Sequence, residues 1–187
     1  GVDQLAGADL HLFGKLTGVA GTPAIDAQLV GRAGDPAALL RLANMEVPSG
    51  LKNASFNLHA TGGWQRMTLD GDLELDGGTL KAQGTASNLD RQYAYDLRLT
   101  GRHPSHARLA ALLGYAGQGD LGSVGIDLSV SGSARRSALK GALDIGAASI
   151  DFDGVLDGLG GAAAGSFAVA VAHPNLAALA KGLAPAL

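Results

Sequence analysis

The sequence predicts a mainly β fold, a curved antiparallel sheet built from repeats of about seventy residues with four strands and one short helix each. Three observations predict it. The chain of 187 residues aligns with itself at a shift of 70 without a gap. Within each repeat, apolar and polar residues alternate, which is typical of strands with one buried and one wet face. Once per repeat the alternation gives way to helical spacing.

The shift of 70 residues predicts how the chain is organised. It places 51–117 on 121–187, and it keeps glycine on glycine at Gly14, Gly84 and Gly154. Self-similarity at a fixed period is the signature of a repeat architecture. We therefore expect the C-terminal part of one unit at 1–50, a second unit at 51–120 and a third at 121–187. Because the first unit starts midway, we expect these units to be a piece of a longer array.

Four strands are expected in each unit. In the second unit they cover 56–60, 68–75, 79–86 and 96–100. Between the second and the third of these strands, Asp76-Gly77-Gly78 predicts a tight antiparallel hairpin.

The apolar positions of the predicted strands fall on one face. In the second and third units they are Phe56, Leu58, Leu69, Leu73, Leu75, Leu80, Leu97, Leu99, Ile126, Leu128, Leu139, Leu143, Ile145, Ile150, Phe152, Phe167 and Val169. Glycines such as Gly71 and Gly84 lie among them, and glycine inside a strand marks sharp curvature or close backbone approach. The face could therefore line a partly open trough, pack tightly on a second sheet, or lie under the short helix, and periodicity alone leaves all three open.

Each unit is expected to end in a short helix. Asp35-Pro36 begins one at 35–42, with a capping side chain followed by a proline in the tolerated first position. The segments 105–113 and 175–183 are its counterparts, with leucines at helical spacing.

Two histidines recur at the corner between the last strand and the helix. His103 and His173 each precede a proline, which enforces an extended backbone there. Catalysis would need a base and an orienting group nearby, and none is evident. We interpret both histidines as structural.

Composition excludes several classes of function. Lys and Arg number 14 against 17 Asp and Glu, so no basic surplus exists for nucleic acid. The absence of cysteine excludes a disulfide framework and a thiolate metal site. Asp151-Phe152-Asp153-Gly154 lacks the further oxygen ligands that a calcium loop needs. We expect no catalytic residue, no metal site and no cofactor.

Several motifs together resemble a known family. They are L-x-L-x-L strands, the D-G-G-x-L hairpin at Asp76–Leu80, the G-x-L-x-L/I strands at 71–75 and 141–145, and the H-P-x-x-A-x-L-A corner. In this order, and over the whole chain, they resemble the AsmA family and, more broadly, the repeating β-groove proteins of Gram-negative envelopes.

The resemblance implies an open, taco-like β-groove in the periplasm that supports phospholipid transport or outer-membrane assembly. Its partner would be a phospholipid or another acyl lipid, bound by the apolar face defined above, with no enzymatic step. No apolar stretch of about 18 residues is present to span a membrane, so an inner-membrane anchor is expected in an N-terminal part outside this chain. Two alternatives stay open: a structural or adhesive β-repeat scaffold with a closed core and no lipid, and a carbohydrate- or ion-binding enzyme module.

Overall fold

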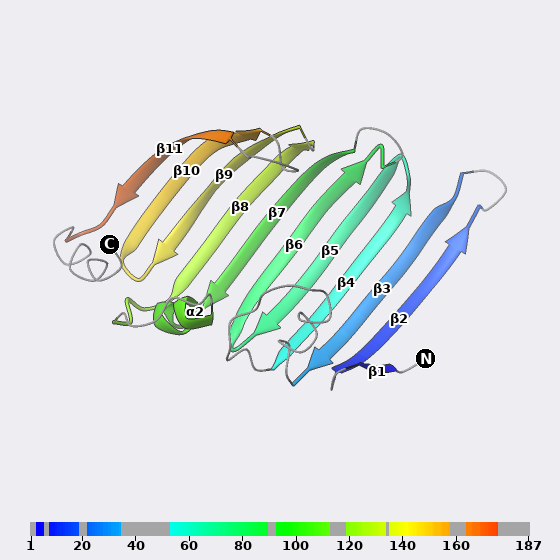
Figure 1. Ribbon diagram of the computed structural model, residues 1–187, viewed down its shortest axis with the longest axis horizontal. Helices are drawn as coiled ribbons and strands as arrows, with labels where there is room; N and C mark the ends of the chain where they lie inside the picture. The colour runs from blue at the N-terminus through cyan, green and yellow to red at the C-terminus, as the bar shows by residue number, and fades with distance from the viewer. Residues whose placement is uncertain are drawn as a thin grey trace.

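The chain forms one open antiparallel sheet. The computed structural model describes residues 3–5, 8–18, 22–34, 53–89, 93–112, 119–133, 135–157 and 164–175. Within them, eleven strands follow one another in sequence order, each paired with the next from β1 to β11 (Figure 1). The predicted mainly β class and the antiparallel pairing are therefore confirmed, and in the described part of the chain the sheet does not close on itself.

Nine of the described strands have ten residues, β11 has nine, and β1 is a short edge strand. The shorter members are β1 (Asp3–Leu5) and β11 (Ala164–Ala172). The others are β2 (Ala8–Thr17), β3 (Ala24–Ala33), β4 (Ala54–Gly63), β5 (Arg66–Leu75), β6 (Gly78–Ser87), β7 (Ala94–His103), β8 (Val124–Ser133), β9 (Arg136–Ile145) and β10 (Ala148–Asp157).

The strands extend beyond the segments that alternation predicts. In β7 the expected segment is 96–100, and pairing continues through Ala94 and Tyr95 at one end and through 101–103 at the other. The predicted hairpin is confirmed, since Asp76 (φ 49°) and Gly77 (φ 83°) both have the positive φ of a type I′ turn. The following glycine, Gly78, already belongs to β6.

The strand bounds recur at the predicted interval. Three of the strands in the C-terminal part of the sheet, β8, β9 and β10, begin 70 residues after β4, β5 and β6. Pairing runs without interruption from β3 to β4 and from β7 to β8. The proposed unit boundaries thus lie inside one continuous sheet, and the division into units stays a prediction.

One of the three expected helices lies among the described residues. It is α2 (His106–Leu112), within the predicted segment 105–113. The segment 35–42 lies outside the described residues, as does nearly all of 175–183. In the part of the chain that the structure describes, no helix has the length and apolar character needed to cross a membrane.

The buried core is thin and lies close to one end of the strands. Among the described residues, the buried apolar ones are Ala33, Leu112, Val124 and Ala148. Two of them, Leu112 of α2 and Val124 of β8, line the same cavity, and α2 lies near the end of β7 (Figure 1). A single sheet has two large faces, so most of its side chains are half-buried or exposed.

Candidate functional site

The strand register places every apolar residue predicted for the site on the same face of the sheet. In antiparallel pairs, directly opposite residues share a face, so Phe56, Leu73 and Leu80 lie side by side. The register extends this face to Phe56, Leu58, Leu69, Leu73, Leu75, Leu80, Leu97, Leu99, Ile126, Leu128, Leu139, Leu143, Ile145, Ile150, Phe152, Phe167 and Val169. We call it the apolar face, and the opposite one the polar face.

Three rows of residues run across the apolar face from β2 to β11, and every member is apolar or glycine. Row 1 is Leu10, Gly31, Phe56, Leu73, Leu80, Gly101, Ile126, Leu143, Ile150 and Val171. Row 2 is Leu12, Leu29, Leu58, Gly71, Ala82, Leu99, Leu128, Gly141, Phe152 and Val169. Row 3 is Gly14, Ala27, Ala60, Leu69, Gly84, Leu97, Val130, Leu139, Gly154 and Phe167. From strand geometry, the three rows form a band roughly 43 Å long and roughly 14 Å wide.

The rows that flank this band on the same face are mostly apolar, and polar side chains interrupt them at Tyr95, Ser137 and His103. Beyond row 3, the hydroxyl of Tyr95 hydrogen-bonds with that of the buried Ser137 and lies 3.5 Å from the carbonyl oxygen of Ser133. Beyond row 1 lies His103, opposite Val124. The Tyr95–Ser137 contact was not predicted from the sequence. The signal that could have indicated it is Ser137 itself, a polar residue at a position where the alternation of its strand calls for an apolar one.

Much of the band is exposed to solvent. The exposed fractions are 70% for Leu12, 47% for Leu58 and 61% for Val169 in row 2, and 46% for Phe167 in row 3. All described strands belong to one sheet, so within the described residues no second sheet packs on this face. Leaving apolar surface in water costs about 25 cal/mol per Å², and a large contiguous patch of this kind marks an interaction surface.

Glycines on this face let large side chains of neighbouring strands lie flat. The ring of Phe56 covers Gly31, and a Cβ at Gly141 would lie 3.0 Å from Cζ of Phe152. A Cβ at Gly71 would likewise lie 2.8 Å from Cδ2 of Leu58. At these positions the absence of a Cβ allows a side chain of the neighbouring strand to lie directly against the glycine backbone. Whether they also curve the sheet stays a prediction.

The polar face carries charges that pair across strands. Arg98 donates to both carboxylate oxygens of Asp127, at 3.1 and 2.6 Å. This hydrogen bond lowers the pKa of Asp127 and raises that of Arg98 relative to their ordinary values. Lys81 and Asp72 lie 3.2 Å apart in a similar cross-strand pair.

Asp151 and Asp153, the two carboxylates of the Asp-Phe-Asp-Gly segment, lie on this polar face. Asp153 is opposite Lys140, with Nζ and Oδ2 3.8 Å apart. Among the residues that the structure describes, no cluster of three or more potential ligands could hold a metal ion.

Helix α2 covers the end of the apolar face next to row 1. Its first turn is fixed by Ser105, whose Oγ accepts the N–H of Arg108 at 3.2 Å. The Oδ1 atom of Asp120 accepts the N–H groups of Ala107 (3.3 Å) and Gly122 (3.1 Å). The Ser105 hydroxyl, followed by these two N–H groups, lowers the pKa of Asp120 below its ordinary value.

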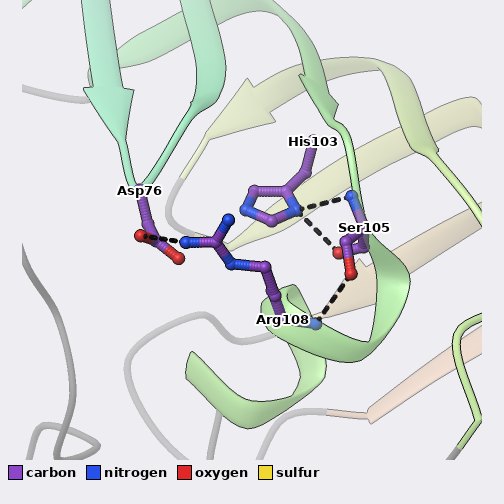
Figure 2. A network of polar contacts seen from close by, with 4 residues as sticks. All are labelled: Asp76, His103, Ser105 and Arg108. Carbon is purple, nitrogen blue, oxygen red and sulfur yellow. Dashed lines mark hydrogen bonds and ion pairs between the residues drawn. The ribbon is translucent and has the colours of Figure 1, made fainter.

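The histidine at this corner is held by backbone groups. Nδ1 of His103 lies 2.7 Å from the carbonyl oxygen and 3.2 Å from the nitrogen of Ser105 (Figure 2). Seventy residues later, Nδ1 of His173 accepts the N–H of Asn175 at 2.8 Å. The shared contact with residue i+2 favours the structural interpretation of both histidines.

Comparison with protein-family models, with curated proteins and with solved structures found no match to this chain.

Proposed function

We propose that the apolar face binds the acyl chains of lipids, and that the chain is a lipid-conducting or lipid-shielding segment of an AsmA-like envelope protein. The observation that carries this proposal is the unbroken band formed by rows 1 to 3. In the same proposal, the protein works in the periplasm and is anchored to the inner membrane by a part outside this chain. It supports phospholipid transport or outer-membrane assembly without catalysing a reaction.

The chemistry of the band suits acyl chains. A hydrocarbon chain needs continuous apolar surface and no directional contacts, and each buried CH₂ contributes about 0.8 kcal/mol. The band is roughly 43 Å long, which exceeds the roughly 30 Å hydrocarbon core of a bilayer. A lipid tail could therefore move along it without leaving an apolar environment.

The repeat and the groove belong to the same proposal. The recurrence of strand bounds at 70 residues supports units of four strands that each add about the same length to the band. We propose that the sheet curves about this face into an open groove, so that the apolar rows line its interior and the paired charges stay outside.

Photo-crosslinking in the host envelope tests the proposal. A cross-linking amino acid is introduced at Leu143, in row 1, and at its neighbour Asp144 on the polar face as the matched control. We expect lipid adducts at Leu143 and few or none at Asp144, and the same contrast between Leu73 and Asp72. Equal labelling of both faces, or none, would contradict lipid binding. Protein adducts at Leu143 in place of lipid would favour the closed-core scaffold.

A further inference from the structure

A cavity lies between α2 and the sheet, beside row 1. Its volume is about 190 Å³, and its walls are leucines of β5, β6 and α2 together with Val124 and Ile126 of β8. Leu109 and Leu112 form the helical wall. Unlike the open rows, this hollow is covered on one side by the helix.

Two glycines form the floor of the cavity. A Cβ at Gly78 would lie 2.6 Å from Cδ2 of His103, and a Cβ at Gly101 would lie 3.0 Å from Cγ2 of Ile126. Seventy residues later, the corresponding positions are Ala148 and Val171. The hollow therefore depends on glycines that its counterparts in β10 and β11 lack.

A polar group without a partner lies in this apolar lining. His103 is only 5% exposed, and its Nε2 atom makes no hydrogen bond to any described residue. An unsatisfied buried nitrogen is costly, so it points to a missing partner. The Arg108 guanidinium lies beside the Nε2 side of the ring and pairs with Asp76 through one nitrogen, at 2.8 Å (Figure 2). Guanidinium has further N–H donors.

We propose that this cavity binds one long-chain fatty acid, with its carboxyl group between His103 and Arg108 and its chain beginning in the cavity. A carboxyl group suits either state of the histidine ring. As a carboxylate it accepts a hydrogen bond from Nε2–H, and in its protonated form it donates one to a bare Nε2. The positive charge of Arg108 favours the carboxylate.

Volume limits the ligand to one chain. An apolar cavity of about 150 Å³ in another protein is enough to hold benzene, so 190 Å³ holds only the first part of a single alkyl chain. The remaining chain would continue along the strands across rows 2 and 3. A phospholipid with two acyl chains does not fit the same entrance.

Calorimetric titration of the full chain with palmitate tests this site. We expect one saturable site that Gly101→Val abolishes by filling the floor, and that Leu109→Trp abolishes from the helical side. Arg108→Gln should weaken palmitate binding about tenfold and leave 1-hexadecanol binding unchanged. Arg98→Gln, which removes a guanidinium from the polar face, is the matched control and should leave both affinities unchanged. Circular dichroism confirms that each variant keeps its strand content.

Equal palmitate affinity in all folded variants would overturn the proposal. The result is separable from that of the proposed function. Leu143 lies on β9 opposite Ile126 and is not itself part of the cavity lining, whereas Leu73 is, so only Leu143 serves for this comparison. If lipid adducts form at Leu143 but the variants leave palmitate affinity unchanged, only the cavity site is contradicted. If the variants lower palmitate affinity but no lipid adducts form at Leu143, only the proposed lipid-binding band is contradicted.

Discussion

The two faces of the sheet share the same strands and the same backbone hydrogen bonds, yet they follow different rules. On the polar face, charges such as Arg98 and Asp127 pair across strands in solvent. On the apolar face, three rows admit only apolar residues and glycine over ten strands.

The contrast shows where the sequence is constrained. Exposed ion pairs contribute little to stability, so one polar-face pair can replace another at small cost. A single charge on the apolar face would interrupt a continuous surface. We therefore expect substitutions to be tolerated very differently at neighbouring positions of one strand.

The largest expected effect comes from a charge in row 2. Leu128 lies between Leu99 and Gly141, and Leu128→Asp should lower the free energy of unfolding by about 2–3 kcal/mol, because it places an unpaired carboxylate in apolar surroundings. Denaturant titration measures the change. The control is Ser129→Asp, between Arg98 and Lys140, which should change stability by less than about 0.5 kcal/mol. Equal losses would mean that the two faces do not differ.

A smaller effect is expected from adding one methyl group. At Gly141, on the apolar face, a Cβ would meet the carbonyl oxygen of Asp127 and lie 3.0 Å from Cα of Leu128. Gly141→Ala should therefore lower stability by about 1–3 kcal/mol, since backbone must shift. At Gly125, on the polar face, the nearest atoms are at 3.7 Å, so Gly125→Ala should be neutral or slightly stabilising. Thermal melts of both variants test the difference, and a stable Gly141→Ala variant would count against close approach.

Asp120→Asn should loosen α2 and slightly lower the melting temperature at neutral pH. The pKa of this carboxyl is lowered in the folded chain, so its contribution is present above the unfolded value of about 3.9. It is lost as the pH falls through the folded value. Melting temperatures of the wild type and the variant should therefore differ at pH 7 and converge as the pH falls below the ordinary carboxyl range. A difference that persists unchanged below that range would show that the charge is irrelevant.

The smallest expected effect concerns the Arg98–Asp127 pair. Because the pKa of Asp127 is lowered by its hydrogen bond from Arg98, Asp127→Asn should reduce stability only above the ordinary carboxyl range. Both groups are exposed, so 1 M salt should remove most of the difference. Melts at low and high salt check this, and a salt-independent loss would point to packing instead of charge.

Alternation was enough to predict the strands and the composition of the apolar face, and the Asp-Gly sequence predicted the turn at Asp76–Gly77, because these features depend on neighbours in sequence. The cavity and its unpartnered His103 could not be predicted. They depend on which residues of β6, β7 and β8 lie opposite one another, and on Asp120 fixing a helix from more than ten residues away.

The proposal that rows 1 to 3 form one continuous lipid-binding band is tested most directly by fluorescence quenching along row 2. Single tryptophans replace Leu29, Leu58, Leu99 or Leu128 in a Trp64→Phe background, and the chain is mixed with vesicles whose phospholipids carry bromine on their acyl chains. We predict quenching at every one of these positions and little at Ser129→Trp on the polar face. Quenching equal on both faces, or absent from the row, would contradict the account.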